Sequence, residues 1–154
     1  MNKRSGTPSQ LLLRHQICHS LYSAANALVR AYRPLLEELD LTYPQYLVML
    51  CLWEQDGVSI RRISDATRFD APTLTPILKR LEGKGLILRQ HSVEDERQKI
   101  IVLTRAGHEL MKAAAGVPGA MACLAGMQAN EARQLKELSE RLYARLAGGE
   151  TDGA

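Results

Sequence analysis

The sequence predicts a mainly α-helical fold: a winged helix-turn-helix with N- and C-terminal dimerisation helices. Apolar residues recur at helical spacing along most of the chain. Only 5% of the residues are aromatic, and alternating β-type runs occur only inside residues 59–104. There, two short helical patterns precede two β-type runs, the order of a motif that places one helix in a DNA major groove and an arm beside it.

The chain length suits one domain. The 154 residues, 45% of them hydrophobic, are enough for a single proper core. We expect this domain to span residues 10–147, with the winged motif at about 44–104 and dimerisation helices at about 10–40 and 105–147. The ends, 1–9 and 148–154, are expected to be disordered.

Composition also predicts the compartment. No apolar run approaches the roughly 20 residues that span a bilayer, and Met1 to Gln10 lacks the apolar core of a signal peptide. We therefore expect a cytoplasmic protein without membrane contact. Cys18, Cys51 and Cys123 are odd in number and far apart, which favours reduced thiols packed as small hydrophobic residues over a disulfide framework.

The first helix is predicted to begin at Gln10. Proline at position 34 predicts a kink or break near Arg33. The apolar face is too wide for one small neighbour, which indicates packing against a second subunit. The apolar face consists of Ile17, Leu21, Ala24, Ala25, Leu28, Tyr32, Leu35, Leu36 and Leu39.

The next helix is predicted to be buried. Thr42 or Tyr43 can cap it, Pro44 suits its first turn, and residues 46–53 are almost continuously apolar. It should end near 56–57, with Cys51 as inert packing in its middle.

The winged motif follows. Its first helix is predicted over 59–66 and its second over a pattern that stops at 83–85, with the cap open between Asp70, Thr73 and Thr75. The second helix buries Leu74, Ile77, Leu78 and Leu81. The β-type runs are 86–89 and 99–103, joined by a charged tip at 94–97.

The C-terminal region is predicted to be helical at both ends. Thr104 resembles a helix cap, residues 113–126 leave a loose helix or an irregular turn open, and Asn130 opens the last helix. Homodimerisation should bury its exposed stripe, which consists of Leu135, Leu138, Leu142 and Leu146.

Charge distribution favours double-stranded DNA as a partner. Residues 59–104 hold nine Lys or Arg and six Asp or Glu, an excess that equals the net charge of +3 on the whole chain. Asp95 shares a strand face with Arg97 and can aim it at a minor groove. A merely solvated charged tip is the alternative. The predicted DNA-contacting residues are Thr73, Thr75, Pro76, Lys79, Arg80, Asp95 and Arg97.

Three segments resemble a known family. Residues 41–50, 73–81 and 95–98 are similar to the MarR family of winged-helix regulators, and more narrowly to its organic hydroperoxide resistance regulator branch, OhrR. By motif order the resemblance covers about 11–146. It implies a repressor, not an enzyme, that binds operator DNA as a dimer when reduced and needs no cofactor.

The resemblance also assigns roles to cysteines and tyrosines. It implies that organic hydroperoxide oxidises Cys18, which two tyrosines of the partner subunit support, at the positions of Tyr32 and Tyr43, with Tyr22 as a further neighbour. Tyr32 lies about 21 Å beyond Cys18 on a straight helix, so the two do not meet within one subunit. Cys123 matches the resolving cysteine of two-cysteine members, which implies release of DNA by a Cys18–Cys123 disulfide.

Three other functions stay open from the sequence. A MarR-type repressor responding to a small aromatic ligand would leave Cys18 unreactive. A metal sensor using His15, Cys18 and His19 lacks an evident fourth ligand. A thiol peroxidase using Cys18 and Cys123 would leave the winged motif without a role.

Overall fold

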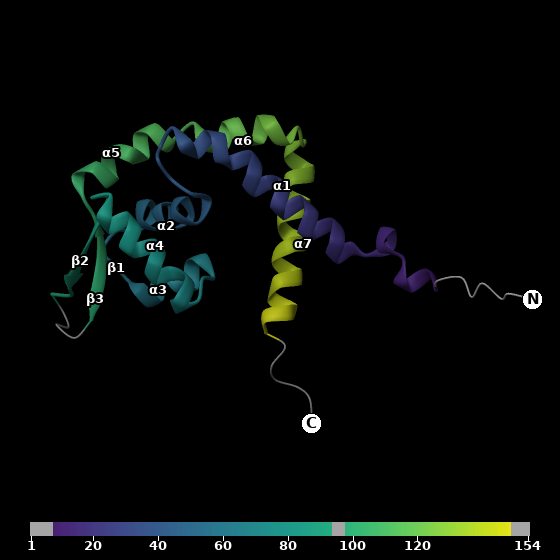
Figure 1. Cartoon of the computed structure of the whole chain (residues 1–154), viewed down its shortest axis with the longest axis horizontal. Coiled ribbons are helices and arrows are strands. Elements are labelled where there is room, and N and C mark those ends of the chain that lie inside the picture. Colours follow the sequence, from purple (N-terminus) through teal and green to yellow (C-terminus); the bar gives the residue numbers. More distant parts are fainter. Residues whose placement is uncertain (1–7, 94–97, 149–154) are drawn as a thin grey trace, which may run out of the picture. The chain divides into compact units, whose positions relative to one another are not determined.

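A computed structural model describes residues 8–93 and 98–148 of the chain (Figure 1). Its contacts group into two compact units, one ending at Val117 and the other beginning at Pro118. Each unit is described by itself. The expectation of a single domain over 10–147 stays a prediction.

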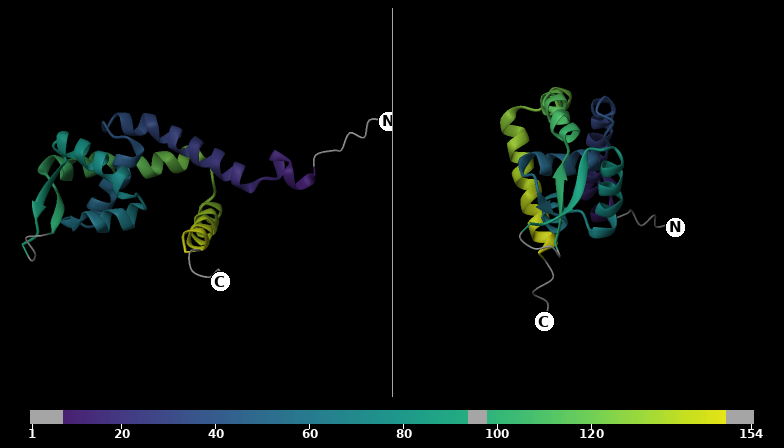
Figure 2. Two further views of the ribbon diagram at one scale, coloured as in Figure 1. Left: turned by 60° about the horizontal axis from the view of Figure 1, so that its bottom comes forward. Right: turned by 90° about the vertical axis from the view of Figure 1, so that its left-hand side faces the viewer.

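The first unit confirms the predicted winged helix-turn-helix. Two 3-10 turns, Ser9–Leu11 and Leu13–His15, precede the regular elements. These are α1 (Ile17–Glu37), α2 (Tyr43–Glu54), β1 (Val58–Ser59), α3 (Ile60–Thr67), α4 (Ala71–Gly83), β2 (Ile87–His91), β3 (Lys99–Leu103) and α5 (Arg105–Ala114). Strands β2 and β3 form a ribbon beside the pair α3 and α4 (Figures 1 and 2).

The predicted start of the first helix is wrong, and of the kink or break predicted near Arg33 the break does not occur. Gln16 has an extended backbone, and its side chain donates hydrogen bonds to the carbonyls of Gln10 (2.6 Å) and Leu12 (3.3 Å). These bonds stabilise a turn, so α1 begins seven residues later than expected. The helix then continues through Pro34 to Glu37. Pro34 costs only one backbone hydrogen bond, close to the helix end, and Leu36 in that last turn is fully buried.

Polar caps begin four helices of this unit. The Thr42 hydroxyl accepts from the amide of Gln45, whose side chain accepts in return from the Thr42 amide, so Thr42 rather than Tyr43 caps α2. Of the three candidate caps of α4, Asp70 is the one that caps the helix, since its carboxylate accepts from the Thr73 amide at 2.8 Å. Ser59 and Thr104 cap α3 and α5 in the same way.

The sheet has a third strand that the sequence did not reveal. Its order is β1-β3-β2, and both pairings are antiparallel. Two residues, Val58 and Ser59, form β1 opposite Ile101 and Ile100. A strand of two residues carries no periodic signal. The first ribbon strand, β2, runs to His91 and is longer than expected.

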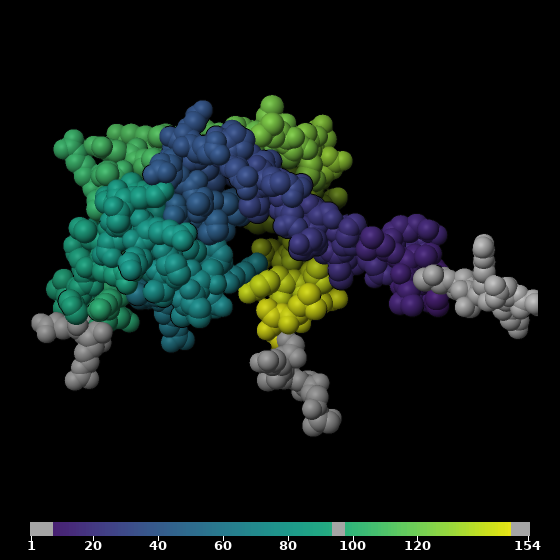
Figure 3. Space-filling view, in the orientation of Figure 1, coloured from purple at the N-terminus to yellow at the C-terminus, as the bar shows by residue number. Residues whose placement is uncertain are grey.

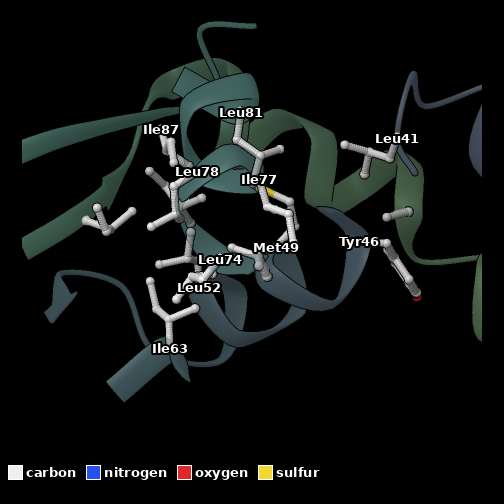
Figure 4. Close-up of a cluster of buried hydrophobic side chains, with 14 of the residues drawn as sticks. Leu41, Tyr46, Met49, Leu52, Ile63, Leu74, Ile77, Leu78, Leu81 and Ile87 are labelled. Atoms are coloured by element: carbon white, nitrogen blue, oxygen red, sulfur yellow. The ribbon is translucent and has the colours of Figure 1, made fainter. Parts of the chain in front are cut away.

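The core forms around α2. Val48, Met49 and Leu52 are fully buried. Met49 and Leu52 lie beside the apolar face of α4 that the sequence predicted (Figure 4). Ile63 of α3 and Ile87 of β2 complete the cluster. The helix-turn-helix and the ribbon therefore share one core.

The junction between β3 and α5 is tightly packed. The indole Nε1 of Trp53 donates to the Gly107 carbonyl at 3.0 Å, and the Thr104 hydroxyl donates to the Gly85 carbonyl at 2.6 Å. A Cβ on Gly107 would overlap the Leu86 carbonyl oxygen. Only glycine allows the first turn of α5 to approach the start of the ribbon this closely.

The described part of the second unit is formed by two helices. The region left open between 113 and 126 forms α6 (Val117–Ala125), which begins at the last residue of the first unit, and α7 (Ala129–Ala147) follows. Gln128 and Glu131 form a capping box at the start of α7. Among the described helices, no single one is long and apolar enough to cross a bilayer, although 105–125 and 129–147 pass that test as a bent pair.

The predicted disordered ends fall mostly outside the described residues. Positions 1–7 and 149–154 are not described. Ser9, however, begins a 3-10 turn, and Gly148 donates its amide to the carbonyl of Ala144 at the end of α7.

We predict that Gly107→Ala lowers the free energy of unfolding by about 1–3 kcal/mol, because the added methyl group overlaps the Leu86 carbonyl. Urea denaturation measures this change. Gly83→Ala is the control, since a Cβ there meets no atom within 4 Å. Equal stability of the Gly107 variant and the native protein would show that the junction tolerates expansion.

We also predict a pH-dependent contribution of the Asp70 cap. Hydrogen bonds from the Thr73 side chain and backbone amide lower the pKa of the Asp70 carboxyl. A carboxyl with a lowered folded pKa stabilises the protein above its unfolded pKa, and that contribution disappears as the pH falls through the folded value. The urea midpoint of Asp70→Ala should therefore lie below that of the native protein at pH 7, and the gap should close below about pH 4. Asp65→Ala, on the exposed surface of α3, should show no such gap.

Candidate nucleic-acid interface and cysteine site

The outer face of α4 carries the predicted DNA-contacting side chains. Burial of Leu74, Ile77, Leu78 and Leu81 turns the rest of the helix outward. Thr73, Thr75, Pro76, Lys79 and Arg80 are all exposed. The surface of α3 and α4, in teal, is visible in the space-filling view (Figure 3).

The Thr75 hydroxyl is partly committed to its own helix. It donates to the Ala71 carbonyl at 2.8 Å. A hydroxyl has one hydrogen to donate, so while Thr75 donates to Ala71 it cannot also donate to a phosphate oxygen or to N7 or O6 of guanine, which are acceptors. The free lone pair of Thr75 can instead accept from an exocyclic amino group of adenine or cytosine.

Helix α3 adds two cations that the predicted site omitted. Arg61 and Arg62 lie in its first turn and are exposed. Both belong to the nine Lys or Arg of residues 59–104, but the predicted DNA contacts lie only on the second helix of the motif and on the wing. Exposed arginines beside the second helix of the motif suit phosphate contacts.

The wing contributes less free charge than its composition indicates. Arg89 of β2 is half-buried, and its Nε lies 3.3 Å from a Glu82 carboxylate oxygen at the end of α4. This ion pair joins the ribbon to the second helix of the motif. The predicted contacts Asp95 and Arg97 lie outside the described residues.

Cys18 lies exposed in the first turn of α1. No side-chain hydrogen bond from the N-cap residue, Gln16, caps this helix end. Arg14 and His15, which precede Cys18 by four and three residues, lie in a 3-10 turn outside α1, and His15 Nδ1 makes contacts of 2.9 and 3.2 Å to Ser9. Tyr22 is on α1, one turn after Cys18, and 71% exposed.

Tyr32 and Tyr43 meet although they come from different helices. Their ring centroids are 4.8 Å apart, with the planes tilted by 39°. Burial raises the pKa of the Tyr32 hydroxyl. The pKa of Tyr43 is raised mainly by burial and further by its proximity to Tyr32. Both hydroxyls therefore remain protonated hydrogen-bond donors at neutral pH.

Tyr46 joins this pair and was missed from the sequence. Its ring centroid lies 5.9 Å from that of Tyr32 and 6.3 Å from that of Trp53. Burial is the main cause of its raised pKa. Tyr43 and Tyr46 are three residues apart, the spacing that places two side chains on one helix face, and this signal could have identified it.

The other two cysteines differ in environment. Cys51 is half-buried in α2, and burial raises the pKa of its thiol, which nearby Glu54 raises further and Arg62 lowers. Cys123 is exposed on α6, in the second unit. All three cysteines are free thiols. Within the described ranges, no three His, Cys, Asp or Glu side chains gather into a metal-sized group.

A pocket of about 450 Å³ lies beside Tyr43. Its wall includes Val29, Arg33 and Lys84. The Lys84 ammonium is 3.1 Å from the Asp40 carboxylate and also donates to the Asp40 carbonyl. The Arg33 guanidinium makes no hydrogen bond or ion pair with another described residue, so it is the available cation of this pocket.

Comparison with known proteins agrees with this geometry. Residues 41–99 match the MarR family. The organic hydroperoxide resistance transcriptional regulator of Bacillus subtilis (strain 168) is 40% identical over 134 residues, which cover 87% of this chain and 89% of that protein. The regulator TtmR of Methylorubrum extorquens (strain PA1) is 39% identical over 98% of this chain and 80% of its own length.

Solved structures agree as well. Reduced AbfR bound to DNA superposes with a TM-score of 0.75 at 33% identity, over 90% of this chain and 95% of that chain. AbfR, from Staphylococcus epidermidis, has also been solved with its disulfide formed, at a TM-score of 0.61 and 32% identity over 86% and 93% of the two chains. The chain therefore belongs to the MarR family of transcriptional regulators, in the organic hydroperoxide resistance branch.

Proposed function

We propose that this protein is a thiol-based, organic-hydroperoxide-sensing transcriptional repressor. It binds operator DNA as a homodimer when reduced and releases the DNA when Cys18 is oxidised and linked to Cys123. The observation that carries the proposal is the contact of Tyr32 with Tyr43 at 4.8 Å. It gathers two protonated phenols, which can donate to the thiolate of a partner subunit's sensor.

A homodimer explains both the tyrosine pair and the exposed apolar faces. Cys18 and Tyr32 lie on one uninterrupted helix, about 21 Å apart, so a second copy must supply the thiol. Large apolar side chains are exposed at Ile17 and Leu28 of α1. On α7, Leu135, Leu138, Leu142, Tyr143 and Leu146 are 41–75% exposed. Contiguous exposed apolar surface of this kind marks a protein interface.

The proposed redox steps balance. The Cys18 thiolate attacks the outer peroxide oxygen and the O–O bond breaks, so the thiolate becomes sulfenic acid and the hydroperoxide leaves as an alcohol after taking up a proton. The Cys123 thiol then attacks the sulfenic sulfur, which forms a disulfide and releases water. The disulfide requires Cα atoms within about 7 Å.

Relatives support the redox reading in general terms. The Bacillus relative is named for organic hydroperoxide resistance. AbfR is described on DNA in its reduced form and also with its disulfide formed. We transfer to this chain the sequence of states: DNA-bound when reduced, and disulfide-linked when oxidised.

A second function is favoured by the pocket beside Tyr43. Arg33 offers a free cation there, next to an aromatic ring, which suits a small aromatic acid. A repressor that responds to such a ligand would release DNA without using Cys18. The two functions therefore differ in one residue that can be tested.

We predict that Lys79→Ala weakens binding to DNA of any sequence, because an exposed lysine on α4 neutralises a phosphate. In fluorescence anisotropy, the slope of log K against log salt should fall by about two units, one for each subunit of the proposed dimer. Lys112→Ala on exposed α5 is the control and should leave the slope unchanged. An unaltered slope in the Lys79 variant would remove this lysine from the interface.

We predict that Cys18→Ser binds operator DNA but does not release it on treatment with cumene hydroperoxide, since it lacks the attacking sulfur. Cys123→Ser should form sulfenic acid but no reducible disulfide. Gel shifts on the upstream DNA of the gene, followed by non-reducing electrophoresis, measure release and crosslinking together.

Cys51→Ser is the control for this series, because burial keeps its thiol protonated. It should respond as the native protein does. Normal peroxide release by Cys18→Ser would refute the thiol mechanism. Release of Cys18→Ser by an aromatic acid alone would instead support the ligand-responsive repressor.

A further inference from the structure

We propose that Trp53 is a positioning residue that couples the tyrosine pair to the base of the wing. This inference rests on the proposed function only in taking Tyr32 and Tyr43 as the sensor's partners. The coupling itself follows from contacts within the first unit. None of the residues involved was singled out for this role by the sequence.

The tyrosine pair continues as a row of rings along α2. Tyr46 contacts Tyr32 at 5.9 Å between centroids, and Trp53 contacts Tyr46 at 6.3 Å in an edge-to-face arrangement. Tyr46 and Trp53 are seven residues apart, about two helical turns, so they share one face of α2. The row therefore passes from Tyr43 through Tyr32 of α1 to Tyr46, and ends at Trp53 in the last turn of α2.

The row ends in a hydrogen bond to a different element. Trp53 Nε1 donates to the Gly107 carbonyl, in the first turn of α5. Gly107 is packed so closely on Leu86 that a Cβ would not fit. The Thr104 amide also donates to the Leu86 carbonyl at 3.0 Å. Because no free space separates these backbones, a displacement of Gly107 must move Leu86, where the wing begins.

A second contact holds the same junction. One Asp56 carboxylate oxygen, just beyond the end of α2, accepts from the Leu103 amide at 2.8 Å and from the Gly57 amide at 2.7 Å. The other oxygen lies 3.4 Å from His108 Nε2. Two residues at or just beyond the C-terminal end of α2 therefore hold this junction: Trp53 bonds to the first turn of α5, and Asp56 contacts both the last residue of β3 and the first turn of α5.

The consequence is a short mechanical link. Tyr43 begins α2 and touches Tyr32. Near the other end of α2, Trp53 donates to Gly107 of α5, which packs against Leu86 where the wing begins. Tilting α2 to relieve or strengthen the tyrosine contact shifts the Trp53–Gly107 hydrogen bond. The wing then moves relative to α4, which packs on α2 through separate apolar contacts.

The first test replaces the indole donor and keeps an aromatic ring. In Trp53→Phe, the ratio of DNA dissociation constants with and without cumene hydroperoxide should fall at least threefold, while the rate of Cys18 oxidation stays the same. Leu50→Ala, exposed on α2, is the matched control and should keep the ratio. An unchanged ratio in Trp53→Phe, or an equal loss of affinity in both redox states, would overturn the proposal.

The second test needs no peroxide. Hydrogen exchange of the amides of residues 103–107 should be faster in reduced Tyr43→Leu than in the native protein, and a Tyr43→Leu substitution should add nothing in a Trp53→Phe background. Independent, additive effects would overturn the coupling. If peroxide does not release DNA from the native protein but the effects of the two substitutions on hydrogen exchange are non-additive, the proposed hydroperoxide response is refuted and the coupling through Trp53 is retained. Thermal unfolding of each variant confirms that it is folded.

Discussion

The packing of α2 against α4 is the interaction on which the rest of the structure depends. Met49 and Leu52 of α2 are buried beside Leu74 and its neighbours on α4. Burial of that face fixes which side of α4 is exposed, and therefore which residues can meet DNA. The same helix carries Tyr43 and Trp53 at its two ends. Helix α4 and the tyrosine pair therefore both pack on α2.

The elements with strong local signals were predicted well from the sequence. The apolar face of α4, the cap at Thr104 and the ribbon strand at 99–103 are local features, and the structure confirms them. The helix start at Gln10 was wrong because Gln16 forms side-chain bonds that no periodic pattern encodes. The strand β1 was missed because two residues acquire their conformation only from pairing with β3.

The site divides in the same way. Exposure of Lys79 follows from helical periodicity and was predicted, whereas Arg80 was expected at the margin of the buried face and is exposed. The contact between Tyr32 and Tyr43 joins two helices, so the sequence alone gave no distance between them. Tyr46 and Trp53 read as ordinary core residues in an apolar run, and only their ring contacts and the bond to Gly107 distinguish them. Tertiary geometry supplied what residue spacing could not.

Three cysteines in one chain would be expected to compete for an oxidant, yet their environments separate them. Only the thiolate attacks a peroxide, and burial in α2 raises the pKa of Cys51 and so lowers its thiolate fraction. Cys18 and Cys123 are both exposed, but Cys18 alone combines exposure with an uncapped helix start. In the proposed mechanism, Cys123 acts second and needs no special reactivity, since a resolving thiol has only to reach a sulfenic acid that already exists. The proposed order of the two oxidation steps then agrees with the exposure of Cys18 and Cys123 and the burial of Cys51.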